Sequence, residues 1–512
     1  MPDAADDQEP VLRLLADPAT YGGAEVRRLD THAASVFLAG DRALKVKRAV
    51  RFPFLDYSTL AKRKAACAAE IAVNRPFAPQ LYRGVVPIAR AADGRLALDG
   101  EGTPVEWAVD MRRFDEMRTL DHLADTGEID AALADRLARA VAAAHARAPV
   151  VDAAPWIDAL ADFLAQNDVA FRDYPELFAA AEAERLGRLS RAALARLVPL
   201  LVARGQQGLV RRGHGDLHLG NIALIDNEPV AFDAIEFDPL IAAGDVLYDL
   251  AFLLMDLVER GLATAANIVL NRYLGETRRP EDLDALAALP LFLSLRAAIR
   301  AKVTAARGAS AAVDARPAIF RAARTYFDLA GRLIVPPASR LVAVGGLSGS
   351  GKSVLARALA PELLPVPGAV VLRSDVERKA RFGVGESERL PASAYAPDVT
   401  AALYATLADK ARRVVAAGHS AIVDAVFARP HERALIAAAG VPFRGLFLTA
   451  DLATRLARVT DRSADASDAG AAVARAQENY ALGDFAGTDW ICVDASGTPE
   501  ETLARAREAL SS

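Results

Sequence analysis

Cysteine and lysine are both scarce in this chain of 512 residues. The only cysteines, Cys67 and Cys492, lie far apart in sequence, so we expect no disulfide framework and a reducing compartment. Of the 61 basic Lys and Arg residues, eight are lysine. Because a compact ammonium and a planar guanidinium suit different tasks, each isolated lysine is a candidate for a specific role.

The chain also lacks a basic excess and a long hydrophobic run. Its formal net charge is −5, so no global positive field would draw it to nucleic acid or to an anionic membrane. The most apolar stretches, 246–258 and 286–295, are short and are flanked or broken by Asp, Pro and Arg, which is typical of buried helices. The acidic first seven residues do not resemble a signal peptide. We expect a soluble, cytoplasmic protein without a membrane partner.

A chain of this length is expected to form two to four domains. The clearest boundary is the Pro-Pro stretch at residues 334–339. Before it, a mixed region with a predicted hairpin at 35–47 and a helix at 59–74 leads into segments that are mostly helical. We predict an N-terminal domain over 11–333 and a C-terminal domain over 340–512.

After the linker, apolar runs alternate with segments of helical periodicity, which predicts a parallel α/β sheet. The predicted strands cover residues 341–344, 370–372, 420–423, 445–448 and 490–493.

Residues 346–353 read Gly-Leu-Ser-Gly-Ser-Gly-Lys-Ser, the complete G-x-x-x-x-G-K-S pattern of a P-loop (Walker A). A predicted strand precedes this segment and a predicted helix follows it, as a phosphate-binding loop requires. The glycines let backbone N–H groups turn toward a phosphate, and the helix N-terminus adds partial positive charge. Lys352 is predicted to reach the β- and γ-phosphates of ATP and Ser353 to bind Mg²⁺. The predicted nucleotide-binding residues of this loop are Gly346, Ser348, Gly349, Ser350, Gly351, Lys352 and Ser353.

A second constellation lies in the N-terminal half, where residues 214–221 read His-Gly-Asp-Leu-His-Leu-Gly-Asn and an apolar run then leads to Asp233. Kinase chemistry needs one carboxylate near the acceptor hydroxyl, and an amide and a second carboxylate to hold Mg²⁺. The pattern resembles the catalytic loop of aminoglycoside phosphotransferase-like kinases, relatives of protein kinases. That resemblance implies Asp216 as the catalytic base, Asn221 and Asp233 as metal ligands, and His214 as a brace. The alternative is a metal site or a polar turn at the two histidines, although no third spaced ligand is evident.

A kinase-like small lobe should also supply a strand lysine and a helix glutamate. Lys45, late in the second hairpin strand, and Glu70, in the following helix, are predicted to form the pair that orients the nucleotide phosphates. Lys47 points to the same face and stays an alternative, as does the interpretation that both lysines are solvated. Asp245 and Asp249, four residues apart on a helix, resemble the aspartate motif that buttresses the catalytic loop in this family.

The acceptor side of the P-loop domain is predicted from aspartates at strand ends. Asp375 follows the strand at 370–372, at the sheet edge where ligands bind. This segment resembles the acceptor-binding strand of P-loop small-molecule kinases, which implies that Asp375 positions or deprotonates the attacking hydroxyl and that Arg378 grips the substrate. Asp424 is placed to bind Mg²⁺ or its waters. Either aspartate could instead be a helix N-cap.

Three arginines at helical spacing, Arg455, Arg458 and Arg462, precede a polar loop. The segment resembles the lid of adenylate- and gluconate-kinase-like enzymes, whose arginines close over the phosphoryl group. Arg462 is the candidate catalytic arginine. A solvated basic helix face is the alternative for the other two.

The two halves in this order resemble a bacterial two-domain family, over about residues 11–510, in which an aminoglycoside phosphotransferase-like kinase domain is fused to a P-loop (AAA-type) ATP-binding/kinase domain. The resemblance implies α/β and α+β domains: a bilobal protein-kinase-like fold, with a mixed small lobe and a helical large lobe, followed by a parallel-sheet P-loop kinase fold. It implies ATP and Mg²⁺ as cofactors. It says nothing of the acceptor, and no acidic cleft for a cationic antibiotic is evident in 240–333.

We therefore predict an ATP-binding, bifunctional phosphotransferase that transfers the γ-phosphate of Mg-ATP to hydroxyl groups of small molecules. One alternative is a polynucleotide 5′-hydroxyl kinase in the C-terminal domain, which the acidic composition disfavours. Another is a nucleotide-gated regulatory switch, in which one domain binds ATP without transferring phosphate. The sequence does not identify either acceptor, the coupling between the domains, or the oligomeric state.

Overall fold

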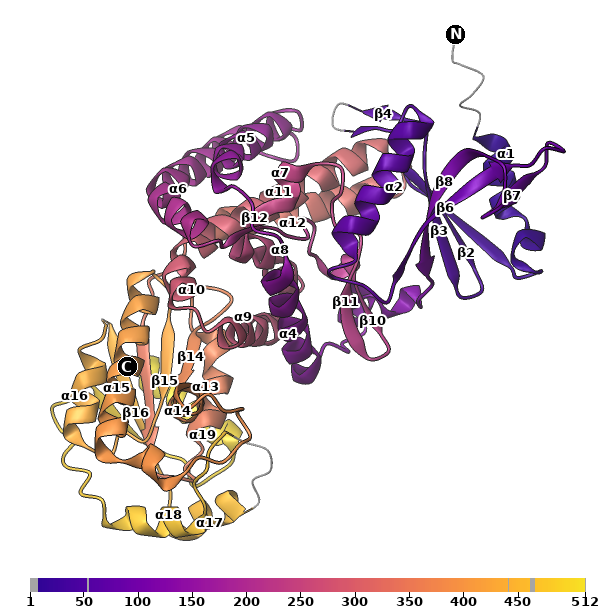
Figure 1. The fold of residues 1–512 in the computed structure, drawn as a ribbon. Helices are drawn as coiled ribbons and strands as arrows, with labels where there is room; N and C mark the ends of the chain where they lie inside the picture. Colours follow the sequence, from indigo (N-terminus) through magenta and orange to yellow (C-terminus); the bar gives the residue numbers. More distant parts are fainter. Residues whose placement is uncertain (1–7, 53–54, 441, 461–465, 512) are drawn as a thin grey trace. The chain divides into compact units, whose positions relative to one another are not determined.

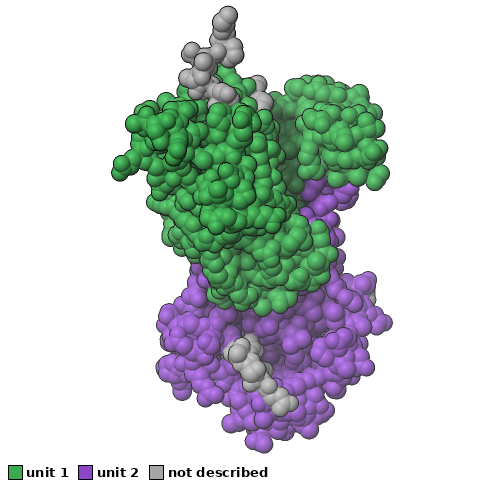
Figure 2. Space-filling model, turned by 90° about the vertical axis from the view of Figure 1, so that its right-hand side faces the viewer, with its two compact units in different colours: residues 1–256, 296–323 green, residues 257–295, 324–512 purple. Residues whose placement is uncertain are grey.

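The computed structural model describes residues 8–52, 55–440, 442–460 and 466–511 (Figure 1). It contains two compact units, coloured separately in Figure 2. Unit 1 comprises the chain up to Asp256 together with Arg296–Ala323, and unit 2 comprises Leu257–Leu295 and the chain from Arg324 onward. The division falls within helices α8 (Val246–Glu259), α11 (Leu289–Ser310) and α12 (Arg316–Leu333), so residues before the predicted linker belong to both units.

Unit 1 begins with a six-stranded sheet in the order β1-β2-β3-β8-β6-β7, with every neighbouring pair antiparallel. Its strands are β1 (Val26–Asp30), β2 (Ala34–Ala39), β3 (Arg42–Lys47), β6 (Tyr82–Arg90), β7 (Leu96–Leu98) and β8 (Thr103–Arg112). The predicted hairpin corresponds to β2 and β3. Strand β1 was not predicted, because its sequence Val-Arg-Arg-Leu-Asp carries only two apolar residues and pairs along the edge of the sheet.

The two faces of this sheet have different partners because side chains alternate along a strand. Leu44 and Val46 of β3 pack with Val11 and Leu15 of α1 (Glu9–Ala16). Lys45 and Lys47 therefore point to the opposite face, which α2 (Leu60–Asn74) covers. This alternation directs both lysines toward α2.

The remainder of unit 1 is mostly helical and carries short strands that shape a loop. Strand β9 precedes that loop, β10 and β11 form a hairpin after it, and β12 pairs with β9. These elements are α3 (Leu120–Asp125), α4 (Ala131–Arg147), α5 (Ala153–Arg172), α6 (Ala180–Gln206), β9 (Val210–Arg212), β10 (Ile222–Ile225), β11 (Glu228–Ala231), α7 (Pro239–Ala242) and β12 (Ala243–Asp245). An antiparallel sheet followed by mostly helical segments confirms the predicted kinase-like N-terminal fold.

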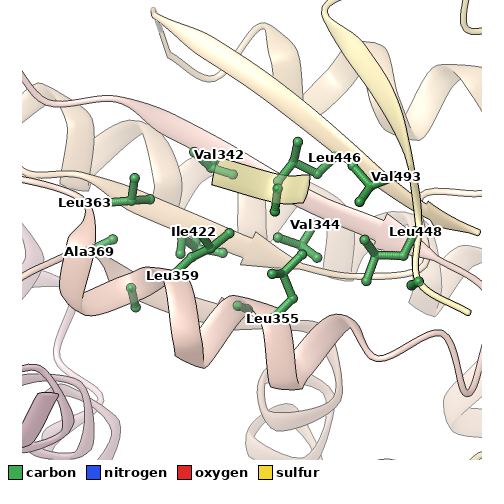
Figure 3. Packing of buried hydrophobic residues seen from close by; sticks show 14 residues of the cluster. Val342, Val344, Leu355, Leu359, Leu363, Ala369, Ile422, Leu446, Leu448 and Val493 are labelled. Atoms are coloured by element: carbon green, nitrogen blue, oxygen red, sulfur yellow. The ribbon is translucent and has the colours of Figure 1, made fainter. Parts of the chain in front are cut away.

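Unit 2 is built on a parallel five-stranded sheet in the order β14-β15-β13-β16-β17. The strands are β13 (Leu341–Gly346), β14 (Val370–Arg373), β15 (Ala421–Asp424), β16 (Phe443–Thr449) and β17 (Trp490–Asp494). All five predicted strands are present, with ends shifted by one or two residues. Apolar residues of the central strands pack against α13 (Lys352–Leu359) and α19 (Pro499–Ser511), as Figure 3 shows for Leu355 and Leu359 against Val344 and Ile422.

The other helices of unit 2 connect these strands or cover them. They are α9 (Ala263–Thr277), α10 (Pro280–Asp284), α14 (Ser374–Arg381), α15 (Pro397–Ala416), α16 (Pro430–Ala437), α17 (Leu452–Thr460) and α18 (Ala471–Ala476). Residues 334–340, at the predicted linker, form neither helix nor strand. No helix in the described part of the chain combines the length and the apolar character that a membrane span requires.

Candidate active sites

The loop between β9 and β10 brings Asp216 and Asn221 together. The Asn221 side chain donates from Nδ2 to the Asp216 backbone oxygen and to its Oδ2, each at 3.0 Å. His218 Nε2 lies 3.5 Å from the same carboxylate oxygen. Burial alone would raise the pKa of Asp216, but the hydrogen bond and the electrostatic interaction with His218 lower it to about 2. The carboxylate is therefore ionised at neutral pH.

The β10–β11 hairpin returns the chain to this loop and places Asp233 beside it. The Phe232 N–H donates to the Asn221 backbone oxygen at 2.9 Å. Asp233 itself has a left-handed backbone (φ 60°), and its N–H donates to the Tyr82 hydroxyl at 3.1 Å. Its carboxylate is half-exposed. Asn221 and Asp233 together offer amide and carboxylate oxygens, the donors that Mg²⁺ prefers.

Asp249 on α8 holds the loop that carries Asp216 and Asn221. Its carboxylate accepts the N–H groups of His214 and Gly215 at 2.8 and 2.9 Å, and His145 Nε2 lies 3.1 Å from Oδ2. These contacts lower the pKa of Asp249, although burial alone would raise it. A second carboxylate on the same helix, Asp256, accepts the N–H of Leu219 at 2.9 Å. Asp249 occupies the position expected of the buttress.

The other predicted structural residues have separate partners. His214 Nε2 lies 2.9 Å from the Phe232 carbonyl oxygen, and burial lowers its pKa, so the ring is neutral at neutral pH and braces the strand that leads to Asp233. Asp245 does not touch the loop. It pairs with the buried Arg204 at 2.5 and 2.8 Å.

Lys45 and Lys47 both reach Glu70, so the structure joins the two predicted alternatives in one cluster. Lys45 Nζ lies 3.0 Å from Glu70 Oε1 and 2.6 Å from Asp233 Oδ1. Lys47 Nζ lies 2.5 Å from Glu70 Oε2 and 2.5 Å from Glu236 Oε1. Lys47 is 2% exposed, and neither lysine is a solvated strand residue. Only Lys45 bridges Glu70 to the predicted metal ligand Asp233.

In unit 2, the P-loop connects β13 to α13 as its sequence pattern predicts. Gly349 has a positive φ of 86°, and a Cβ there would lie 2.4 Å from the Arg455 backbone oxygen, so only glycine fits. Lys352 Nζ donates to the Leu347 carbonyl oxygen at 3.2 Å. The side chain of Lys352 therefore extends back over the P-loop and binds the backbone at its start.

Ser353 and Asp424, the two residues predicted to bind Mg²⁺, are in contact. The Ser353 hydroxyl donates to Asp424 Oδ2 at 2.5 Å. Arg373, which was not predicted, lies beside both: its Nε is 3.4 Å from Asp424 Oδ2 and its NH2 is 3.2 Å from Ser353 Oγ. A hydroxyl and a carboxylate side by side are a suitable donor pair for Mg²⁺.

Asp375 lies with Lys352 and Asp424 on the wall of a cavity of about 1200 Å³ that also includes most of the P-loop. Burial and the neighbouring Asp424 raise the pKa of Asp375, while Lys352 and a hydrogen bond with Ser467 lower it. Neither aspartate is a helix N-cap, since α14 and α16 are capped by Arg373 and Arg429. The alternative interpretation of these two aspartates is therefore wrong.

The two described arginines of α17, Arg455 and Arg458, donate hydrogen bonds to backbone carbonyl oxygens of unit 2. Arg455 is 2% exposed, donates to the Ser348 carbonyl oxygen at 3.4 Å and pairs with Glu478. Arg458 donates to the carbonyl oxygens of Ala495 and Gly497 at 2.8 and 2.7 Å. Neither side chain forms a solvated basic face. The predicted catalytic Arg462 lies outside the described residues.

Sequence reasoning missed Gln477, whose side-chain oxygen accepts the N–H of Ser348 at 2.7 Å. It also missed Ser467 beside Asp375. Both residues come from the segment after α17, more than ninety positions beyond the groups they contact. Ser467 lies in the segment Asp-Ala-Ser-Asp-Ala at 465–469, which is part of the family resemblance, but its contact with Asp375 was not predicted.

Comparison with known proteins assigns both halves. The model of the phosphotransferase enzyme family matches residues 27–289, and that of an AAA domain matches residues 341–481. Uncharacterized protein Rv2004c of Mycobacterium tuberculosis and uncharacterized protein Mb2027c of Mycobacterium bovis are each 30% identical to this chain over 413 residues, 79% of this chain and 79% of the relative.

Solved structures are similar to parts of the chain. A choline/ethanolamine kinase family protein from Mesorhizobium loti is 17% identical and covers 64% of this chain and 99% of its own, with a TM-score of 0.37. The APS kinase CysC of Mycobacterium tuberculosis is 24% identical and covers 35% of this chain and 100% of its own, with a TM-score of 0.27. The family matches confirm the predicted order of a kinase-type, nucleotide-binding domain and a P-loop domain. The chain belongs to the phosphotransferase enzyme family, with an AAA domain following the family segment.

Proposed function

We propose that the protein is a bifunctional kinase, which transfers the γ-phosphate of Mg-ATP to a small-molecule hydroxyl at each of two sites. The observation that carries this proposal is the repetition of one set of groups. Each unit has a lysine for phosphate, a carboxylate for the acceptor hydroxyl and a pair of oxygen donors suited to Mg²⁺.

In unit 1, Lys45 and its partner Glu70 orient the phosphates of the nucleotide. Asn221 and Asp233 would hold Mg²⁺, which neutralises phosphate charge when bound. Asp216 is ionised and accepts the proton of the attacking hydroxyl. Because the chemistry needs in-line positioning more than bond-making by the protein, the bonds that fix Asp216 and its loop are part of catalysis.

In unit 2, the P-loop N–H groups and Lys352 bind the phosphates, and Ser353 with Asp424 would hold Mg²⁺. Asp375 lies on the same cavity wall and receives the proton of the second acceptor. We further propose that Arg462 contributes a positive charge to this transfer. The domain limits at 11–333 and 340–512 stay a prediction, as do small-molecule partners at both sites.

The test uses γ-labelled ATP and a small-metabolite extract with wild type, Lys352→Ala and Asp216→Ala. Two labelled products are expected, one lost in each variant, with ATP binding at the N-terminal site retained in Asp216→Ala. A protein that carries both Lys352→Ala and Asp216→Ala should form neither product. Phosphate transfer by that protein would contradict the catalytic roles proposed for both residues.

A nucleotide-gated switch is the second candidate. It is favoured by the enclosure of the P-loop, whose Lys352 is bonded to its own loop and whose Ser348 is fixed by Gln477. Label that moves only to water, together with a partner that binds in an ATP-dependent way, would support the switch. Salt-sensitive binding of a single-stranded oligonucleotide would support a polynucleotide kinase instead.

A further inference from the structure

Two neighbouring buried cations on α14 differ in how they are neutralised. Lys379 is 1% exposed, and its Nζ lies 3.2 Å from Asp468 Oδ1. Arg378 is 7% exposed and donates from NH1 to the Ala394 carbonyl oxygen at 2.5 Å, but its buried Nε has no hydrogen-bond partner. No carboxylate of the described residues lies within ion-pair distance of Arg378. Among the described residues, one cation therefore has a counter-ion and the other does not.

The Arg378 guanidinium is held in place on the wall of the cavity in unit 2. It lies over the Tyr395 ring, 4.7 Å from the centroid, and Thr400 Oγ1 is 3.4 Å from NH1. All these contacts come from the segment 394–400, and none comes from the P-loop. A buried, unpaired charge is costly, and a rigid guanidinium fork matches two oxygens of a carboxylate, phosphate or sulfate.

The carboxylates on the same wall are already engaged. They are Asp375, Asp424, Glu432 and Asp468, which contact Ser467, Ser353, the Arg429 N–H and Tyr395. By contrast, the side chains of Arg389 and Arg429 also line the cavity and have no ion pair with a described residue. These four carboxylates are outnumbered by the six basic side chains that line the cavity, so the balance of charge around a ligand is positive; the six are Lys352, Arg357, Arg378, Arg389, Arg429 and Arg458.

We infer that the acceptor of this site carries an oxyanion group besides the hydroxyl that is phosphorylated, and that Arg378 binds this group. The inference rests on the proposed function of the site. Asp375 and Arg378 are three residues apart on one helix and so project to the same side. The acceptor class is a hydroxy acid or a phosphorylated or sulfated alcohol. A neutral sugar or a cationic amino alcohol would leave Arg378 without a counter-ion.

The first experiment separates a metabolite extract by charge at neutral pH into anionic, neutral and cationic pools. Each pool is incubated with γ-labelled ATP, Mg²⁺ and full-length Asp216→Ala protein, so that only unit 2 transfers phosphate. Label is expected in a product of the anionic pool, and adding Lys352→Ala abolishes it. Adding Arg378→Met lowers the yield at least about ten-fold, as expected for the loss of a charged hydrogen bond. Arg381→Met, which removes an exposed arginine of the same helix, leaves it unchanged. Label only in the neutral or cationic pool overturns the inference.

The second experiment measures binding without transfer. Inorganic sulfate is titrated by calorimetry into full-length protein saturated with Mg²⁺ and a non-hydrolysable ATP analogue, so that the P-loop is already filled. Arg378→Met is expected to bind sulfate at least about ten-fold more weakly than wild type, and Arg381→Met equally well. Arg378→Lys keeps the charge and the stem, is expected to be intermediate, and replaces the methionine variant if that variant does not fold.

The two readouts separate the inference from the proposed function. Sulfate binding that is equal in wild type and the Arg378 variants overturns the oxyanion site. Arg378-dependent sulfate binding without label in any pool rejects phosphate transfer by unit 2 and supports the oxyanion site.

Discussion

The side-chain amide of Asn271 binds the edge of β14 at two points. Its Oδ1 accepts the Val371 N–H at 2.7 Å, and its Nδ2 donates to the Ala369 carbonyl oxygen at 3.1 Å. Asn267, one turn earlier on α9, adds a bond to Ala369 at 3.0 Å. Because β14 is an outer strand of its sheet, α9 supplies the partners that another strand would. The strand leads directly to Asp375.

We expect Asn271→Leu to lower phosphate transfer by unit 2 about ten-fold. The change leaves the Val371 N–H without a partner, at a cost of about 1–3 kcal/mol, and removes one of the two side-chain hydrogen bonds to the Ala369 carbonyl oxygen, which loosens the strand that leads to Asp375. Transfer by unit 1 should not change, and both activities are measured in the full chain. Asn271→Asp keeps an acceptor for Val371 but loses the donor, so it should be intermediate. Full unit 2 activity in Asn271→Leu would contradict this role.

Lys45 and Lys47 should differ in their effects although they share Glu70. Lys45→Met removes the ammonium that bridges Glu70 and Asp233 and is expected to lower unit 1 transfer by about 100-fold or more. Lys47→Met removes the cation that pairs with the buried Glu236 and one of the two that pair with Glu70, so it should lower the free energy of unfolding by about 3 kcal/mol or more. Kinetic assays measure the loss of transfer, and denaturant unfolding measures the loss of stability, so the two variants can be distinguished. A larger catalytic loss in Lys47→Met would assign the phosphate role to that lysine.

Acid should destabilise the protein through His419. Burial lowers the pKa of His419 to about 4, while a contact with the Gly368 carbonyl oxygen at 2.8 Å favours the charged ring. Between that value and the unfolded pKa near 6.5, the unfolded chain binds more protons than the folded chain. The free energy of unfolding therefore decreases as the pH falls through this range. The total decrease due to His419 is about 3 kcal/mol at most.

Denaturant unfolding at pH 7 and pH 5 tests this expectation. His419→Gln should lose less stability between the two pH values than wild type does. His431→Gln, which changes an exposed histidine, should behave as wild type. An equal acid response in wild type and His419→Gln would show that the ring does not titrate in this way.

The pH profile of unit 2 should reflect Asp375. Since burial and Asp424 raise its pKa, the rate of transfer should rise with pH through a value above the ordinary aspartate pKa of about 4. Ser467→Ala removes an interaction that lowers this pKa, so the rise should move to still higher pH with a similar plateau. A profile that does not move in Ser467→Ala would argue against Asp375 as the base.

Local sequence patterns were enough to identify most of the candidate site residues. The P-loop and the strands before Asp375 and Asp424 were evident because each is a short apolar run followed by polar residues of fixed spacing. The loop at Asp216 and Asn221 was evident for the same reason. Lys45 and Lys47 could not be separated by sequence because they share a face of β3, and both do contact Glu70.

Groups that act across long sequence distances carried no such signal. Asn271 and Gln477 are polar residues in helical segments, and their partners are backbone atoms about one hundred positions away or more. A side chain that binds backbone atoms does not require any particular residue type at the partner position. A sequence pattern therefore cannot identify such a contact. The assignment of Leu257–Leu295 to unit 2 was likewise invisible, because it depends on these contacts.

The cover that α9 gives to β14 has a consequence for recombinant fragments. A fragment that starts at Arg340 would keep the whole sheet but expose the backbone groups of Ala369 and Val371 along its outer strand. Bare strand edges pair with those of other molecules. Such a fragment should self-associate, whereas one that starts at Leu257 carries its own cover and should stay dispersed.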